Sequence, residues 1–308
     1  MIVKTIQHFL TMEELTPDTL DSLMQLAHEV KRSPQSYATV LTGKKVALLF
    51  EKASTRTRMS FEVGVVELGG YPLFLSGQDL QIGRGEPLTD TIQVMSRYVD
   101  ALMIRTYAHE TVETLAQHGS IPIINGLTDL HHPCQVLADL LTIEERFGSR
   151  AGKVLTYIGD GNNMAHSLMI GGALSGMHIR IASPNGYTVD QGIYEKAKKL
   201  AESTGGSIAL FENPSLAANG ADIVYTDVFA SMGQEGEAEE RLMKFNGFQV
   251  NEELMALANP DAIFLHCLPA HRGEEVTAEV IDGPQSWVFD QAENRLHAQK
   301  ALMLTLLT

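Results

Sequence analysis

The segment STRTR, residues 54–58, follows the apolar run KVALLF and combines three hydroxyl groups with two guanidinium groups. Ser54 is expected to cap a helix that runs to about Leu68, and the N–H groups and positive dipole end of such a helix favour an anion. The remaining hydroxyls and the planar guanidinium forks suit phosphate or carboxylate. A simple serine cap with solvated arginines is the alternative, but the density of donors favours an oxyanion site. The segment lacks the glycine and lysine spacing of a P-loop.

The segment HHPCQ offers two groups for a carbonyl-containing ligand. His132 could polarise a carbonyl oxygen, and the Gln135 side chain could accept a hydrogen bond from an amide NH₂. A capping histidine beside a buried Cys134 is the alternative, and it would be preferred for this segment alone. Cys134 and Cys267 lie far apart without paired Cys/His spacing, so the sequence predicts no zinc site.

Two further segments contain reactive or charged groups at the ends of expected strands. Asp227, in DIVYTDVFASMG, suits a substrate ammonium group, with an Asx-turn or helix cap as an equally good alternative. Cys267, in FLHCLPAHRG, is either a small buried hydrophobe or an activated thiol, and cysteine usage alone favours the former.

The segment YIGDGNNMAHS resembles a dinucleotide fingerprint only in part. The third glycine would fall at Met164, and no acidic residue ends the next expected strand, HIRIASPNG. We therefore reject nicotinamide binding and expect no cofactor. Asn162 and Asn163 are then either ligand-binding groups at a strand end or parts of a turn.

Short apolar runs that alternate with amphipathic segments must position these groups, and this alternation predicts an α/β fold with parallel sheets flanked by helices. The expected strands are KVALLF, YPLFL, DALMIR, IPIIN, KVLTYIG, HIRIAS, SIALF, DIVYTD, AIFLHC and WVFDQ. The polar segments follow strands in both halves, and ligands of open α/β sheets bind beyond the carboxyl ends of strands. We therefore predict two domains, 1–148 and 149–290, with the active site in the cleft between them and a C-terminal helix, 291–308, packed back on the first domain.

Composition limits the class of partner. The chain has 308 residues and a net charge of −15, which argues against nucleic acid or an anionic membrane as a partner but leaves room for a small anion in a locally positive pocket. Two cysteines cannot form a disulfide framework, and the first twenty residues have no leader-like apolar core. We expect a cytoplasmic protein.

Together these segments resemble the aspartate/ornithine carbamoyltransferase family almost end to end. STRTR is similar to its carbamoyl phosphate loop, HPCQ to its second contact segment and AENR to its C-terminal arginine motif. The segment from Asp227 to Gly233 and HCLP are similar to the motifs of the ornithine branch.

The resemblance implies transfer of the carbamoyl group from carbamoyl phosphate to the δ-amine of L-ornithine, without a metal, a cofactor or a covalent enzyme intermediate. It implies catalytic roles for Arg105, His132 and Cys267. The implied carbamoyl phosphate ligands are Ser54, Thr55, Arg56, Thr57, Gln81, Arg105, His132, Gln135, Cys267, Leu268 and Arg295. The implied ornithine ligands are Asn163, Asp227, Ser231 and Met232.

The resemblance also implies a homotrimer whose active sites are shared, with Gln81 reaching into the neighbouring subunit. Two alternatives to the ornithine reaction stay open. The chain could carbamoylate another amine, such as putrescine or N-acetylornithine, or it could be a non-catalytic phosphate-binding homologue. A nicotinamide dehydrogenase is a distant third, because the dinucleotide fingerprint is incomplete.

Overall fold

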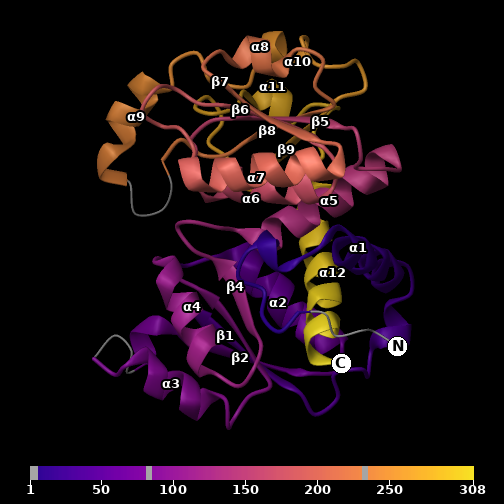
Figure 1. Cartoon of the computed structure of the whole chain (residues 1–308), viewed down its shortest axis with the longest axis vertical. Coiled ribbons are helices and arrows are strands. Elements are labelled where there is room, and N and C mark those ends of the chain that lie inside the picture. The colour runs from indigo at the N-terminus through magenta and orange to yellow at the C-terminus, as the bar shows by residue number, and fades with distance from the viewer. Residues whose placement is uncertain (1–5, 81–84, 231–234) are drawn as a thin grey trace. The chain divides into compact units, whose positions relative to one another are not determined.

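The computed structural model describes residues 6–80, 85–230 and 235–308 (Figure 1). Its internal contacts divide the chain into two compact units, residues 1–141 with 293–308 and residues 142–292. The predicted boundary lies just after helix α5 (Pro133–Phe147), whereas this division falls within that helix. Two predicted ornithine ligands, Ser231 and Met232, and the predicted phosphate ligand Gln81 lie outside the described residues.

The first unit contains a four-stranded parallel sheet. Its strands are β1 (Lys45–Phe50), β2 (Tyr71–Ser76), β3 (Ala101–Arg105) and β4 (Ile123–Leu127), in the order β2-β1-β3-β4. Successive side chains of a strand point to opposite faces. The residues Ala47, Leu49, Leu102 and Ile104 therefore share one face, where they pack with apolar residues of α3 (Leu88–Met95) and α4 (His109–His118).

The first unit also contains three longer helices, α1 (Pro17–Arg32), α2 (Thr55–Glu67) and most of α12 (Val288–Leu307), which lie together in Figure 1. A Cβ atom at Gly64 of α2 would lie 3.2 Å from Lys300 Cγ and 3.2 Å from Met303 Cε, so glycine allows α12 to approach closely. The expected helix after Ser54 is confirmed, and it ends at Glu67, with Leu68 as its C-cap before Gly69, whose φ is +84°.

The second unit contains a five-stranded parallel sheet in the order β7-β6-β5-β8-β9. These strands are β5 (Val154–Ile158), β6 (His178–Ala182), β7 (Ser207–Phe211), β8 (Ile223–Thr226) and β9 (Ile263–His266). The helices α6 (Asn163–Leu174) and α7 (Gln191–Thr204) lie together below the sheet in Figure 1. The short helices on the opposite side are α8 (Pro214–Ala218), α10 (Glu252–Met255) and α11 (Ala278–Ile281).

The predicted fold class is confirmed, with one error among the expected strands. The segment WVFDQ is not a strand, because α12 already begins at Val288 and Gln291 N donates to Trp287 O at 2.9 Å, a helical hydrogen bond. The apolar run is only three residues long, and the C-terminal helix, which we expected to begin at residue 291, already includes Val288 and Phe289. Within the described residues no helix is both long and apolar enough to span a membrane.

Candidate active site

The strand order of each unit reverses at one place, and the polar segments meet there. In the first unit β2 lies on one side of β1 and β3 on the other, so the segment after β1 and Arg105 at the end of β3 share one edge. In the second unit β6 and β8 flank β5 in the same way, so the segments after β5 and β8 share an edge. Such switch points are where parallel sheets bind ligands.

The first-unit site begins at the N-terminus of α2. Ser54 Oγ accepts a hydrogen bond from Thr57 N at 3.2 Å, which caps the helix. Thr57 Oγ1 in turn accepts from Arg295 Nη2 at 3.1 Å, and Arg295 Nη1 donates to Gln135 Oε1 at 2.6 Å. Thr57, Gln135 and Arg295 are each at most 2% exposed. Three segments that are far apart in the sequence therefore hold one buried guanidinium group.

A buried histidine lies among these positive charges. His132 is 5% exposed, and its pKa lies well below the ordinary value because burial disfavours the imidazolium form and the charges of Arg295 and Arg105 oppose protonation. Arg105 is itself buried. His132 is therefore a neutral imidazole at neutral pH, suited to hydrogen bonding with a carbonyl group rather than to carrying a charge.

The other members of STRTR differ in their surroundings. Arg56 is half-buried and Thr55 is exposed on the first turn of α2. The Arg58 guanidinium group lies over the Phe74 ring, 3.6 Å from the ring centroid, and forms an ion pair with Glu62. The charge of Arg58 therefore interacts with the edge strand β2 and with its own helix. Arg56 is the second residue of α2 and therefore lies within its first turn.

Sequence reasoning missed Lys52, which stands two residues before Ser54. Lys52 is 5% exposed, pairs with Asp129 and lies over the Tyr107 ring at 4.3 Å from its centroid. It thereby ties together the segments that follow β1, β3 and β4. A lysine directly before a donor-rich helix was the available signal, but its partners could not be named from the sequence.

The second-unit site contains a carboxylate and a thiol in contact. Cys267 Sγ donates to Asp227 Oδ1 at 3.0 Å, and Asn162 Nδ2 donates to Asp227 Oδ2 at 3.2 Å. Asn162 caps α6, and Tyr157 OH donates to its Oδ1 at 3.2 Å. Burial, and next the charge of Asp227, raise the pKa of Tyr157 well above its ordinary value, so Tyr157 stays protonated as a donor. The predicted ligand Asn163 is the adjacent, half-buried first residue of α6, and sequence reasoning missed the direct contact from Asn162.

The backbone after Cys267 is held in an uncommon conformation. Leu268 has a φ of +57°, and its N–H donates to His266 Nδ1 at 2.8 Å. His266 Nε2 contacts Glu275 Oε1 at 3.1 Å, and both side chains are fully buried. Because Nδ1 accepts a backbone N–H, the proton of the neutral ring lies on Nε2 and is donated to Glu275. This pair fixes the turn that presents Cys267 and the Leu268 carbonyl.

Potential metal ligands also occur here among the described residues. Donor atoms of Asp227, His266 and Cys267 lie within 4.8 Å of one another. However, Cys267 and Asp227 share a hydrogen bond, and both ring nitrogens of His266 are occupied by Leu268 N and Glu275. The donor set is therefore arranged for hydrogen bonding rather than for coordination.

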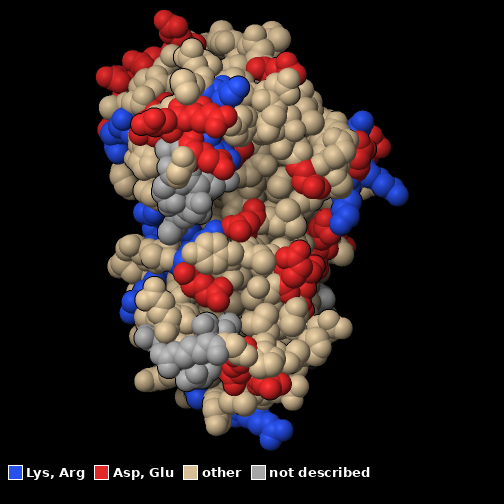
Figure 2. Space-filling view, turned by 90° about the vertical axis from the view of Figure 1, so that its left-hand side faces the viewer, with Lys and Arg blue, Asp and Glu red and all other residues tan. Residues whose placement is uncertain are grey.

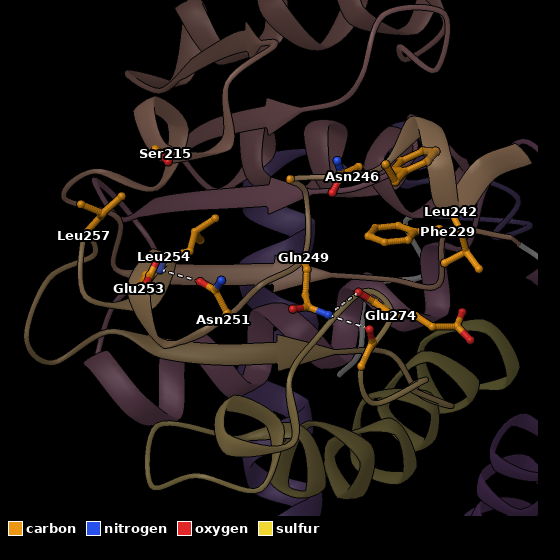
Figure 3. A pocket seen from close by; sticks show the side chains of 13 residues that line it. Ser215, Phe229, Leu242, Asn246, Gln249, Asn251, Glu253, Leu254, Leu257 and Glu274 are labelled. Carbon is orange, nitrogen blue, oxygen red and sulfur yellow. Dashed lines mark hydrogen bonds between the residues drawn. The ribbon is translucent and has the colours of Figure 1, made fainter. Parts of the chain in front are cut away.

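A separate pocket of about 680 Å³ lies in the second unit (Figure 3). Phe229 and Leu242 form an apolar part of its wall, while Gln249 Nε2 donates to the backbone oxygens of Gly273 and Glu274. The described residues that line it include none of the predicted site residues. The pocket is therefore distinct from the first-unit site around Arg295 and from the second-unit site around Asp227 and Cys267.

The exposed surface and the first-unit site differ in the sign of their charge. In the face shown in Figure 2, acidic side chains are more widespread than basic ones, as expected from the net charge of −15. Two arginines of the first-unit site are instead buried, with Arg105 8% and Arg295 2% exposed. The protein therefore combines an acidic exterior with a buried positive site.

Both halves of the chain match models of one family. Residues 7–145 match the carbamoyl-P binding domain, and residues 151–306 the Asp/Orn binding domain, of aspartate/ornithine carbamoyltransferase. The chain belongs to the aspartate/ornithine carbamoyltransferase family. The first-unit group lies in the former match, except for Arg295, and the second-unit group lies in the latter.

Relatives in this family are similar over almost the whole chain. The chain is 56% identical to an ornithine carbamoyltransferase of Halalkalibacterium halodurans over 300 residues, which cover 97% of this chain and 94% of the relative. The solved ornithine carbamoyltransferase of Pyrococcus furiosus has a TM-score of 0.94 at 50% identity, covering 98% of this chain and 97% of that one. The anabolic ornithine carbamoyltransferase of Campylobacter jejuni has a TM-score of 0.93 at 43% identity, with coverage of 98% and 99%.

Proposed function

We propose that this chain transfers the carbamoyl group of carbamoyl phosphate to the δ-amine of L-ornithine, which yields L-citrulline and phosphate. The observation that supports this most strongly is that one chain contains both a buried guanidinium group held by Thr57 and Gln135 and a contact between Asp227 and Cys267. Relatives that are 54–56% identical over nearly the whole chain have the name ornithine carbamoyltransferase.

The first-unit group is proposed to bind carbamoyl phosphate. The N-terminus of α2 offers backbone N–H groups and a positive dipole end to the phosphate. The neutral imidazole of His132, together with Arg105, would hold the carbonyl oxygen, and Gln135 would accept from the carbamoyl NH₂. The full proposed set is Ser54, Thr55, Arg56, Thr57, Arg105, His132, Gln135 and Arg295, with Gln81 from a neighbouring chain.

The second-unit group is proposed to bind ornithine. The carboxylate of Asp227 would accept hydrogen bonds from the α-ammonium group, with Asn163, Ser231 and Met232 as further ligands at the amino-acid end. Cys267 already contacts Asp227, and the Leu268 carbonyl follows it on the fixed turn. Cys267 and Leu268 would lie beside the reacting δ-nitrogen and the carbamoyl group.

In the proposed reaction the neutral δ-amine attacks the carbonyl carbon. A tetrahedral oxyanion forms, the bond from carbon to the phosphate oxygen breaks, and the leaving phosphate takes the amine proton. Arg105 and His132 would stabilise the oxyanion, where one donor is typically worth about 3 kcal/mol. Fixing both substrates in one orientation supplies much of the remaining acceleration.

We further propose a cytoplasmic homotrimer with shared active sites. The support is an exposed apolar face on α2 and the neighbouring edge strand β2, the strand that leads into the predicted bridging loop at Gln81. Its residues are Met59, Val63 and Val66 on α2 and Phe74 on β2. An apolar face of this kind marks an interaction surface, and a second copy of this chain would bring its own loop to the site.

The direct test is product formation by the purified chain. With carbamoyl phosphate and L-ornithine, citrulline and phosphate should appear in equal amounts, and Arg56→Ala should reduce kcat/KM severely while thermal stability changes little. If wild type releases phosphate without forming citrulline, or if Arg56→Ala retains nearly full kcat/KM, the proposal fails.

A further inference from the structure

Gln299 is a fully buried amide on α12 that contacts Ser60 of α2. With its oxygen toward Arg295 and its nitrogen toward Ser60, the oxygen accepts from Arg295 Nε and Nη2, each at 3.1 Å. The nitrogen donates to Ser60 Oγ at 2.6 Å. Gln299 therefore contacts the guanidinium group of one candidate phosphate ligand and the helix that presents the others.

The chemistry of its two neighbours fixes this orientation of the amide. Arg295 has only donors, so the group facing it must be the amide oxygen. Ser60 Oγ lies 2.7 Å from the Arg56 backbone carbonyl and gives its single proton there, so it must accept from the amide nitrogen. Both neighbours require the same orientation, and no donor faces another donor.

We propose that Gln299 is a positioning residue for the anion site, one that fixes the Arg295 guanidinium against the first turns of α2 without neutralising its charge. A continuous chain of hydrogen bonds runs from the Arg56 carbonyl through Ser60 and Gln299 to Arg295, and on to Thr57. This inference rests on the proposed carbamoyl phosphate site, because it explains how that site holds its buried arginine.

The neutrality of the amide is the essential property. Thr57, Gln135 and Gln299, which all accept hydrogen bonds from Arg295, are uncharged. A carboxylate at position 299 would form a bidentate pair with Arg295 and cancel the positive potential that an anion needs. The lowered pKa of His132 gives independent support, because the charge of Arg295 is among its causes and so reaches this part of the site.

Three variants test this inference. Gln299→Glu keeps the shape but adds a charge, Gln299→Met keeps the volume but removes both hydrogen-bonding groups, and Lys300→Met is the matched control. Lys300 is buried on the same helix and bonds Glu67 of α2 at 2.6 Å, but it does not belong to the hydrogen-bond chain of Arg295. KM for each substrate, inorganic phosphate binding by calorimetry and the pKa of His132 by NMR are measured for all three.

Gln299→Glu should raise KM for carbamoyl phosphate and Kd for phosphate by at least about tenfold, the factor for ~1.4 kcal/mol of lost interaction. KM for ornithine should change little. Gln299→Met should weaken phosphate in the same direction, and Lys300→Met should lower thermal stability while leaving phosphate binding as in wild type. The pKa of His132 should rise in Gln299→Glu, because the new carboxylate offsets the nearby positive charge.

Unchanged phosphate affinity and an unchanged His132 pKa in Gln299→Glu would overturn the inference, as would a Gln299→Met variant that behaves like Lys300→Met. The pKa measurement needs no turnover. If wild type formed no citrulline but Gln299→Glu still raised the pKa of His132, the positioning contact would stand and the proposed reaction alone would fail.

Discussion

Replacing Arg241 with methionine should weaken the second unit and its proposed amino-acid site together. Arg241, on α9 (Ala238–Lys244), donates from Nη1 to Asp160 Oδ2 at 2.8 Å and to Phe229 O at 3.0 Å. Arg241 is 6% and Asp160 8% exposed. Breaking a buried pair by removing one partner typically costs about 3–5 kcal/mol, because the other charge is left desolvated. The bond to Glu237 is partly solvated and adds little.

The expected effect on ornithine binding follows from the contacts made at the two ends of the segment from Asp227 to Arg241. Asp227, at its start, accepts a hydrogen bond from Asn162, and Arg241, at its end, bonds Asp160. Both attachments lie on the same short turn after β5. We therefore expect Arg241→Met to destabilise the second unit by about 3 kcal/mol and to raise KM for ornithine at least about tenfold, with little change in KM for carbamoyl phosphate.

Denaturant titration and steady-state kinetics measure both effects. Arg272→Met is the control, because Arg272 pairs with Asp282 at 2.6 Å on the exposed surface and its loss should alter neither property measurably. The double variant Asp160→Asn with Arg241→Met should recover part of the lost stability, since it removes the orphaned charge. If Arg241→Met were as stable as Arg272→Met and used ornithine with an unchanged KM, the attachment argument would be wrong.

Three further predictions concern thiol chemistry, acid stability and assembly. Under native conditions a thiol reagent should label only Cys267, because Cys134 is fully buried and burial raises its pKa to about 12; rapid native labelling of both thiols would contradict this. Burial lowers the pKa of His109 in the folded protein. As the pH falls below about 6.5, His109 is therefore protonated in the unfolded state before it is protonated in the folded state. The free energy of unfolding should then fall by up to about 1.4 kcal/mol per pH unit because of this group. His109→Gln should flatten the curve of unfolding free energy against pH, and an equally steep curve would contradict this. Mixing and reassembling Arg105→Ala and Gln81→Ala chains should restore activity above either parent, whereas confirmed hybrids with no gain would refute a shared site.

The sequence was sufficient for features determined by local chemistry. The cap at Ser54, the end of α2 before Gly69 and the parallel α/β class follow from residue types at fixed spacing, and the structure agrees with each. The segment WVFDQ was placed wrongly, because a three-residue apolar run does not distinguish a strand from the first turn of a helix.

The supporting contacts could not be predicted in this way. Gln299 bonds Ser60, Lys52 pairs with Asp129, and Arg241 bonds Asp160, each across a long separation in the sequence. Each is a polar residue on a helix or loop, where a solvated side chain is the usual expectation. Only the packing within each unit shows that these side chains are buried and which groups they contact.

The most direct test of the central claim is the ratio of kcat/KM values for L-ornithine, N-acetyl-L-ornithine and putrescine with saturating carbamoyl phosphate. If Asp227 recognises a free α-ammonium group, ornithine should be preferred by about 10³ or more, because a site built to bind a polar group strongly rejects analogues without it. Asp227→Asn should reduce that preference mainly through KM. An equal or higher kcat/KM for putrescine or N-acetyl-L-ornithine would contradict the account.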